Sequence, residues 1–411
     1  MKTMRYPLGG RIGVLILLAL SLTGCERAAH PPPPPAAPPA PLRLLDATDL
    51  PLFADDRDLD GLADAIHQSL NYLGRLPPER ALPFGADTLT AEVITRSLMH
   101  FSEFLQTAPS PAQLNDFVRA NYRVYRVAGA PSDGSVLFTG YYEPVVAGSR
   151  VRSGDCTVPV LARPGDLVTI DLERFSARYK GETLTGRLQD GRVVPYFERR
   201  EITDPTVFGA RAKAVAWVAD PLDLFFLQVQ GSGQIQLQDG SRLRVHYHAS
   251  NGHPYRSIGR YLIDSGKIPR EEMSMQRIRS YLEAHPEEIG PVLNHNPSFV
   301  FFKIEEIGPL GALNVPLTPG RSIALDRRIF PPAALCFIQC QKPLVDTAGR
   351  ITQWRPFARF VLNQDTGGAI QGPGRADLFW GSGAIAEISA GHLQHPGSLF
   401  FLVLRENQAP P

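Results

Sequence analysis

The chain has few cysteines, almost no net charge and no apolar run long enough to cross a membrane. Its 411 residues include 4 cysteines, and the formal net charge is +1 because acidic and basic residues nearly balance. A chain this close to neutrality creates no strong field for nucleic acid, so no nucleic-acid partner is expected. The apolar run Ile12–Leu20 is too short to span a bilayer.

Two common catalytic or cofactor motifs are also missing. No Gly-x-Ser-x-Gly element is present, which leaves nucleophilic acyl chemistry with little support. The segment Gln230–Gly233 lacks the third glycine and the following helix of a dinucleotide-binding loop. No cofactor is therefore expected. Gln230 and Ser232 instead form a polar turn that could bind a hydroxyl-rich ligand.

Three of the cysteines lie outside the N-terminal region, and none has the Cys-x-x-Cys spacing of a metal site. Cys336 and Cys340 fall in one apolar run, and on a strand they would lie about 13 Å apart, too far to form a disulfide. We interpret Cys156, Cys336 and Cys340 as packing residues or free thiols.

His246 and His248 would share one face of a strand, and His253 follows closely. A metal site is conceivable there, but no convincing further ligand is nearby in the sequence. Structural or substrate-facing histidines are the preferred interpretation, and no metal is expected.

The N-terminus is typical of a secretory signal, because basic residues precede Ile12–Leu20 and small residues lead to Cys25. Residues 22–25, Leu-Thr-Gly-Cys, resemble a bacterial lipobox. That resemblance implies that residues 1–24 are removed and that Cys25 carries lipids, which would hold the protein at a membrane. Glu26 is the kind of residue found in lipoproteins sent to the outer membrane. We therefore expect the periplasmic face of the outer membrane of a Gram-negative bacterium; a plain cleaved signal is the alternative.

A proline-rich segment follows, since residues 31–41 are nearly all Pro and Ala. Such a segment favours extended polyproline II and acts as a semi-rigid spacer. Residues 25–44 are therefore predicted to be a lipidated cysteine and a linker.

The remaining chain is long enough for two or three domains, and its patterns predict a mainly β protein with N-terminal helices. Apolar residues recur at helical spacing between residues 57 and 126. Two further helices are predicted at 257–266 and 275–285. Strands are predicted at 136–144, 158–161, 193–196, 214–218, 224–237 and 243–248, with a hairpin turn at 238–240, and the chain is predicted to be β-rich from 296 to 404.

Two aspartates flank a loop rich in glycine within the C-terminal β region. Asp365 follows one apolar run and Asp377 begins another, with Gly372 and Gly374 between them. A tight turn with solvated carboxylates is one interpretation. Nearby aromatic residues, including Tyr142 and Trp380, favour carbohydrate chemistry, because sugars stack on aromatic rings and a carboxyl group can protonate a glycosidic oxygen.

Together these strings resemble the membrane-bound lytic murein transglycosylase A family, with its C-terminal three-aspartate domain. The resemblance runs from about Val136 to Leu404, roughly two-thirds of the chain, and its specificity comes from several unrelated strings in one order. The strings are Phe138–Pro144, Leu227–Gly233, Asn251–Gly259, Asn296–Phe302, Ala324–Pro332 and Asp365–Ile370 with Asp377.

The resemblance implies a double-psi β-barrel as the large domain, formed by residues 45–143 and 308–411. A smaller β domain, residues 144–307, would be inserted into it, with a groove for the glycan strand between the two. The three family aspartates match Asp326, Asp365 and Asp377. Asp377 matches the single catalytic acid, and Asp365 and Asp326 would be its neighbours.

The other wall of that groove would carry Thr139 and Glu143, and the predicted glycan-binding set is Thr139, Tyr142, Glu143, Gln230, Ser232 and Trp380. Two departures from the family pattern occur. Gln371 stands where the motif commonly has Lys, and the loop between Asp365 and Asp377 is slightly longer than in some members. The assignment of Asp377 therefore depends on its Asp-Leu-Phe-Trp-Gly context.

A lytic transglycosylase cleaves the β-1,4 bond between N-acetylmuramic acid and N-acetylglucosamine without water, which gives a 1,6-anhydro sugar. One carboxyl group then suffices, because the attacking hydroxyl belongs to the substrate. Two alternatives stay open. A hydrolase on the same fold would need a second carboxylate, with Glu143 as the candidate, and a non-catalytic glycan-binding lipoprotein could use the same groove.

Overall fold

A computed structural model describes residues 40–129 and 134–405. The predicted signal 1–24, the lipidated Cys25 and most of the proline-rich linker lie outside the described residues. At the end of the predicted linker, β1 (Leu42–Leu44) pairs antiparallel with β4 (Tyr122–Val127). Within the described ranges, no helix is long and apolar enough to cross a membrane.

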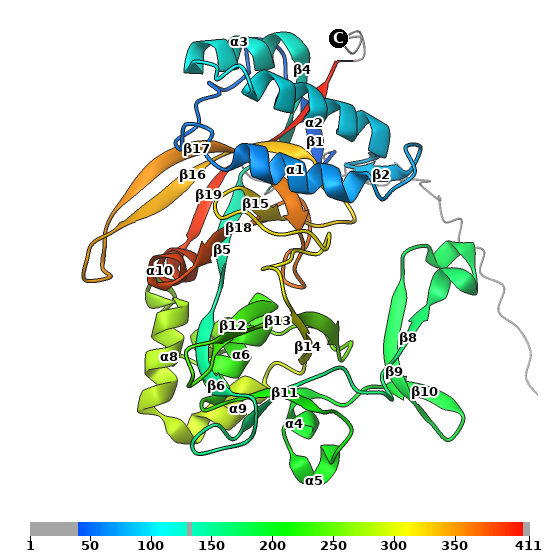
Figure 1. The fold of residues 1–411 in the computed structure, drawn as a ribbon, viewed down its shortest axis with the longest axis vertical. Coiled ribbons are helices and arrows are strands. Elements are labelled where there is room, and N and C mark those ends of the chain that lie inside the picture. Colours follow the sequence, from blue (N-terminus) through cyan, green and yellow to red (C-terminus); the bar gives the residue numbers. More distant parts are fainter. Residues whose placement is uncertain (1–39, 130–133, 406–411) are drawn as a thin grey trace, which may run out of the picture. The chain divides into compact units, whose positions relative to one another are not determined.

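The central feature is a closed β-barrel of six strands (Figure 1). The strand order is β19-β16-β17-β15-β18-β5, and β5 pairs back onto β19. The pairs β15–β17 and β18–β5 are parallel, and the other pairs are antiparallel. The prediction of a mainly β fold is thus confirmed. The strands are β5 (Val136–Glu143), β15 (Ser322–Ala324), β16 (Leu335–Val345), β17 (Ile351–Asp365), β18 (Arg375–Ser382) and β19 (Gln394–Leu404).

Helices from the first part of the chain share a core with this barrel. Ile66 and Phe101 belong to the same buried cluster as Phe337 and Phe360 of the strands. Ser110 forms a capping box with Gln113 at the start of the third helix, so its first backbone N–H groups are satisfied. The helices are α1 (Leu62–Leu73), α2 (Ala91–Leu105) and α3 (Pro111–Asn121), and a hairpin of β2 (Ala81–Phe84) and β3 (Asp87–Thr90) separates the first two.

A second sheet of six strands has its own core. One face of this sheet carries Val146, Ile235, Val245 and Phe302, which are buried together. The order is β14-β13-β12-β6-β11-β7. The strands are β6 (Val145–Ser149), β7 (Val158–Leu161), β11 (Ala214–Val218), β12 (Ser232–Gln236), β13 (Arg242–Ser250) and β14 (Val300–Glu305).

The hairpin between β12 and β13 is confirmed, because the two strands pair antiparallel and Gly240 N–H donates to the Leu237 carbonyl. The helices predicted after residue 257 are also confirmed as α7 (Ile258–Asp264) and α8 (Met275–Ala284). Smaller elements complete this region: β8 (Val168–Asp171), β9 (Thr183–Gln189), β10 (Arg192–Pro195), α4 (Arg199–Ile202), α5 (Pro205–Phe208) and α9 (Ile289–Asn294).

The strand predicted over residues 224–230 is wrong, because these residues form helix α6 (Pro221–Gln230). The Asp220 side chain accepts from Leu222 N–H, Pro221 occupies the first turn, and Gly231 ends the helix with φ 79°. Apolar residues lie on most sides of the helix because it packs against two separate cores. Leu224 and Leu227 pack into the core of the second sheet. Leu222, Phe225 and Phe226 pack into a cluster with α7 and α8.

Sequence patterns also missed α10 (Ala384–His392), a helix inside the region predicted to be β-rich, and strands β2, β3 and β4, which lie inside the region predicted to be helical. Ala386 and Ala390 of α10 pack against Tyr142 of β5. Small side chains let this helix lie close to the barrel, and a Cβ at Gly140 would lie 2.8 Å from the Ala390 Cα.

The cysteines behave as packing residues rather than as disulfide partners. Cys336 and Cys340 are buried on β16, Cys156 is partly exposed, and all three are free. Burial raises the pKa of the Cys340 thiol to about 11, so this group stays protonated and unreactive near neutral pH.

Candidate active site

The barrel brings two of the three family aspartates to the same level of two strands that are separated by one strand. Asp365 is the last residue of β17, and Asp377 is the third residue of β18. Strand β15 lies between them, and Ala324 is the register partner of both aspartates. Because adjacent strands are about 4.8 Å apart, the two backbones are separated by roughly 10 Å. Their side chains can therefore share one site.

Asp377 is held by the neighbouring strand β5, where Thr139 is its direct register partner. The Thr139 hydroxyl donates a 2.9 Å hydrogen bond to Asp377 Oδ1 and accepts one of 3.3 Å from Arg375 Nη2. Burial raises the pKa of Asp377 to about 6; the Thr139 hydrogen bond and the Arg375 charge oppose this shift, and the Asp365 charge adds to it. Asp377 is only partly covered, so a ligand can reach it.

Asp365 accepts more hydrogen bonds than Asp377. Its Oδ1 accepts from the backbone N–H groups of Thr366 and Ala312, both at 2.8 Å, and its Oδ2 accepts from the Tyr141 hydroxyl at 2.9 Å. Burial raises the pKa of Asp365 to about 6 despite these three donors. Three donors fix the carboxyl group in one orientation, which suits a residue that positions or tunes its neighbour.

Asp326, the third aspartate, is buried and behaves differently. Burial alone would raise its pKa, but hydrogen bonds from Arg328 and from Gly372 N–H outweigh burial and lower the pKa. Arg328 binds both carboxylate oxygens, at 2.9 and 2.7 Å, and Gly372 N–H donates to Oδ2 at 2.8 Å. Since Gly372 lies in the loop between Asp365 and Asp377, the ionised Asp326 anchors that loop.

The predicted glycan-binding residues Tyr142, Glu143, Gln230 and Ser232 lie where β5 meets the second sheet. Tyr142 N–H donates to Gln230 Oε1 at 3.0 Å, and Gln234 Nε2 donates to Glu143 Oε2 at 2.7 Å. Ser232 begins β12 and is buried. Burial raises the pKa of Glu143, although the Gln234 hydrogen bond and two arginine charges oppose this.

The structure places Trp380 away from Asp377. Its ring packs beside Tyr142, Ala386 and Ala390 under helix α10. Side chains alternate along a strand, so Asp377 and Trp380, three residues apart on β18, point to opposite faces.

Three polar residues near the site were not among the predicted site residues. Arg375 donates to Thr139, and Gln234 donates to Glu143. The Tyr141 hydroxyl donates to Asp365. Period-two alternation along β5 links Thr139 with Tyr141 and could have identified Tyr141. The partners on other strands depend on register, which the sequence does not display.

The histidines do not converge. His253 Nε2 lies 2.7 Å from the Tyr196 carbonyl, and His246 lies opposite Lys303. Among the described residues, no group of three or more His, Cys, Asp or Glu side chains is arranged to hold a metal ion.

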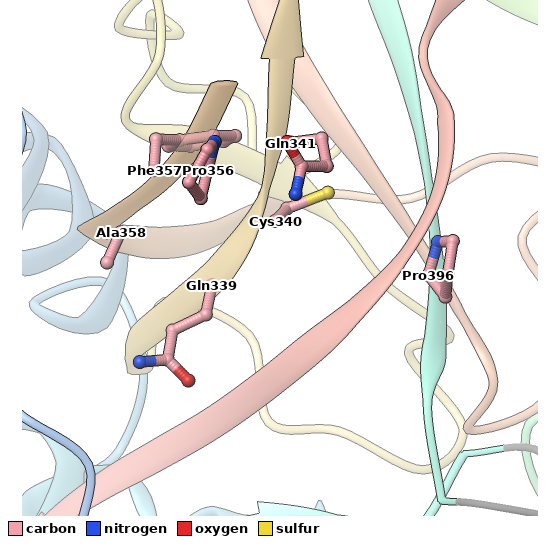
Figure 2. Close-up of a pocket in the computed structure, with 7 residues that line it drawn as sticks. All are labelled: Gln339, Cys340, Gln341, Pro356, Phe357, Ala358 and Pro396. Carbon is pink, nitrogen blue, oxygen red and sulfur yellow. The ribbon is translucent and has the colours of Figure 1, made fainter. Parts of the chain in front are cut away.

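A hollow of about 480 Å³ lies elsewhere on the barrel, over β16, β17 and β19 (Figure 2). It is lined by Gln339, Cys340, Gln341, Pro356, Phe357, Ala358 and Pro396. None of the predicted site residues lines it, and it contains no acidic or basic side chain. It therefore offers no group for acid–base chemistry.

Comparison with known proteins agrees with this geometry. The model of the MltA specific insert domain matches residues 137–303, and the model of the 3D domain matches residues 321–403. The membrane-bound lytic murein transglycosylase A of Escherichia coli K12 is 35% identical over 281 residues, which cover 68% of each chain. The chain belongs to the membrane-bound lytic murein transglycosylase A family.

Solved structures of the family agree with the fold. A membrane-bound lytic murein transglycosylase from Agrobacterium tumefaciens superposes with a TM-score of 0.72 at 31% identity, covering 89% of this chain and 98% of that one. The E. coli family member with bound chitohexaose gives 0.66 at 29% identity, covering 90% and 95%. The match to the 3D domain contains Asp326, Asp365 and Asp377.

Proposed function

We propose that this family member is a lytic transglycosylase that cleaves the β-1,4 bond between N-acetylmuramic acid and N-acetylglucosamine in peptidoglycan, and that it leaves a 1,6-anhydro end. The single observation that carries the proposal is the placement of Asp365 and Asp377 of the matched 3D domain on either side of Ala324, with Asp377 held by Thr139. Burial at this site raises the pKa of both carboxyl groups to about 6. An acid that must protonate a leaving oxygen near neutral pH needs such a shift. Family membership supports the reaction class.

Asp377 is the proposed acid and then the base. Its carboxyl proton goes to the glycosidic oxygen as the bond from that oxygen to the muramic C1 breaks. The C6 hydroxyl of the same muramic residue forms a new bond to C1, and its proton returns to the Asp377 carboxylate. No water is consumed, and the nucleophile is already part of the substrate, so proximity replaces a second catalytic carboxylate.

Asp365 and Asp326 are proposed to position and tune this acid. The Asp365 charge disfavours ionisation of Asp377, which helps to keep the acid protonated. Asp326 holds the loop between the two through Gly372. Thr139 aims Asp377 by donating to Oδ1, which leaves Oδ2 to carry the transferable proton.

The geometry favours this mechanism over hydrolysis with Glu143. Glu143 lies four residues beyond Thr139 on β5, about 13 Å along the strand. Paired carboxyl groups of hydrolases are separated by about 5 to 9.5 Å. Glu143 is also buried and accepts a hydrogen bond from Gln234. We therefore propose that it shapes the groove that holds the glycan.

We propose the following organisation around that chemistry. Residues 45–143 and 308–411 form the large domain with double-psi topology and N-terminal helices, and residues 144–307 form the inserted domain. The glycan lies in the groove between them, against Thr139, Glu143, Gln230 and Ser232, and Tyr142 and Trp380 support this wall from their position under α10. Bound chitohexaose in the E. coli relative supports binding of a β-1,4-linked glycan.

We also propose that Cys25 carries the lipid anchor and that residues 25–44 link it to the enzyme. Relatives named membrane-bound support membrane association. The signal preceding Cys25 supports the periplasmic face of the outer membrane. Metabolic labelling with a fatty-acid analogue, compared between the native chain and Cys25→Ala, tests the anchor.

The product decides between the candidate functions. We expect muropeptides released from purified sacculi to be lighter by one water than the corresponding reducing sugars, as measured by mass spectrometry. Reducing products would establish a hydrolase and make Glu143→Gln the next variant. Sacculi that bind the protein without any release would indicate a glycan-binding module.

The rate should fall as the pH rises through about 6. Burial raises the pKa of Asp377 to about 6, and the proposed first step needs the protonated form. Above that pH the protonated fraction falls about tenfold per unit, so kcat/KM on soluble glycan strands should fall in proportion. A pH profile that stays flat from 5 to 8 would contradict the assignment of the acid.

A further inference from the structure

The face of β12, β13 and β14 that lies opposite their apolar core carries polar side chains in two rows. Residues directly opposite on paired strands share a face, about 5 Å apart. In the first row His246 lies opposite both Ser232 and Lys303, and in the second Arg244 lies opposite both Gln234 and Glu305. We call these six residues the polar wall: Ser232, His246, Lys303, Gln234, Arg244 and Glu305. The opposite face of the same strands is the apolar core with Ile235, Val245 and Phe302.

The polar wall is connected to the proposed active site through β5. Gln234 binds Glu143 at the end of β5, and Thr139 on the same strand binds Asp377. A ligand that reaches from the acid along β5 therefore arrives at the wall after about 13 Å. Figure 1 shows β12, β13 and β14 side by side in this region.

Two buried nitrogens of the wall lack a hydrogen-bond partner. These are Arg244 Nε and His246 Nδ1. Arg244 Nη1 donates to the Glu306 carbonyl at 3.3 Å, whereas its buried Nε has no partner. Unsatisfied buried polar atoms are uncommon in folded proteins and call for an explanation such as a missing ligand. Here the two lie two residues apart on one strand, on the same face.

The charge of the wall favours an anion. Arg244, Lys303 and the next residue along the same face, Arg242, are cationic, whereas Glu305 is the one carboxylate of the wall and forms an ion pair with Lys303, so two positive charges remain in excess. Burial also favours the neutral form of the nearby Glu143. A carboxylate that accepts from Arg244 Nε and from His246 as the Nδ1–H tautomer would lie beside the Lys303 ammonium group. Arginine and lysine are the usual partners of such groups.

We infer that the polar wall binds a carboxylate of the short peptides attached to the muramic acid residues of peptidoglycan, with Arg244, His246 and Lys303 as the recognition residues. The inference rests on the proposed function, because the glycan must lie along β5. It adds a specificity: strands that carry peptides should bind better than bare strands.

Kinetics on two substrates test this inference in the full chain. Glycan strands are prepared from sacculi and divided into one portion with peptides and one from which an amidase has removed them. Arg244→Gln and Lys303→Gln should each raise KM about tenfold on strands with peptides, the effect of losing one charge-assisted hydrogen bond, and leave kcat unchanged. On bare strands the variants should match the native protein.

The control is Arg260→Gln, which removes an exposed cation of α7 paired with Asp264 and should change nothing. Equal losses on both substrates, or no loss, would overturn the inference. Failure of the proposed function looks different, because the native protein would release no anhydro product from bare strands. Binding assays then decide the inference independently of activity: the Arg244 and Lys303 variants must lose affinity for intact sacculi in co-sedimentation and keep the native affinity for soluble strands without peptides.

Discussion

Asp377→Asn should lower kcat by at least about 10³-fold on peptidoglycan, because asparagine can neither donate the proton nor take it back. The amide is almost the same size as the carboxyl group, and its oxygen can still accept the hydrogen bond from Thr139. Binding of glycan should therefore survive. Release of anhydro-muropeptides, followed by mass spectrometry, measures the first effect, and co-sedimentation with sacculi measures the second.

Stability gives an internal check that the Asp377→Asn variant is folded. Folding raises the pKa of the Asp377 carboxyl group to about 6. The folded state is therefore favoured while this group is protonated and disfavoured once it is ionised. The free energy of unfolding of the native protein should therefore fall relative to that of the variant as the pH rises from about 4 to 6. Above about pH 6 the difference between the two proteins should stay constant. Thermal melts at pH 5 and pH 8 measure this, and the variant should melt no lower than the native protein at pH 8.

Asp365→Asn is the matched control for the assignment of the acid. Burial is the main reason that the pKa of Asp377 is raised, and this variant removes the smaller contribution of the Asp365 charge. It keeps an oxygen that can accept from Thr366 and Ala312. We expect partial activity and a pH profile displaced to lower pH. If Asp365→Asn were inactive and Asp377→Asn active, the roles of the two aspartates would be exchanged.

The strands that carry Asp365 and Asp377 could be predicted from the sequence. The proximity of the two aspartates in the folded chain could not. Apolar runs at 360–362 and 378–380 predict β17 and β18 by local pattern alone. The approach of Asp365 to Asp377 depends on β15, a strand of three residues that pairs with both. A strand this short leaves no periodic signal. The different behaviour of Asp326 has the same kind of origin, because Arg328 and Gly372 contact it only in the folded chain.

The helix α6 shows where period-based prediction fails. Its sequence, Pro-Leu-Asp-Leu-Phe-Phe-Leu-Gln-Val-Gln, has apolar residues on every side, so neither a helical stripe nor a strand alternation is visible. The end signals were present, with Asp220 and Pro221 before the run and Gly231 after it. For a segment buried between two cores, these caps carry more information than the hydrophobic period.

The sequence also showed no sign of a buried ion pair between Arg321 and Asp55. Arg321 and Asp55 have side chains that are 0% and 2% exposed, and their two hydrogen bonds measure 2.6 and 2.9 Å. Arg321 also donates to the carbonyls of Asp60 and Phe360, and Asp55 accepts from Phe360 N–H. The pair thus joins the segment before α1 to strands β15 and β17, which hold the aspartate site.

Arg321→Met should therefore destabilise the protein by about 3 to 5 kcal/mol, because it leaves the Asp55 carboxylate buried without its cation. Arg260→Met is the control, since Arg260 and Asp264 form an exposed pair whose loss costs at most about 1 kcal/mol. Thermal and urea unfolding of both variants measures the difference. The double variant Asp55→Leu with Arg321→Met should recover part of the loss, because no unpaired charge then stays buried. If Arg321→Met melted within a degree of Arg260→Met, the pair would contribute little, and the barrel would hold the N-terminal segment by apolar packing alone.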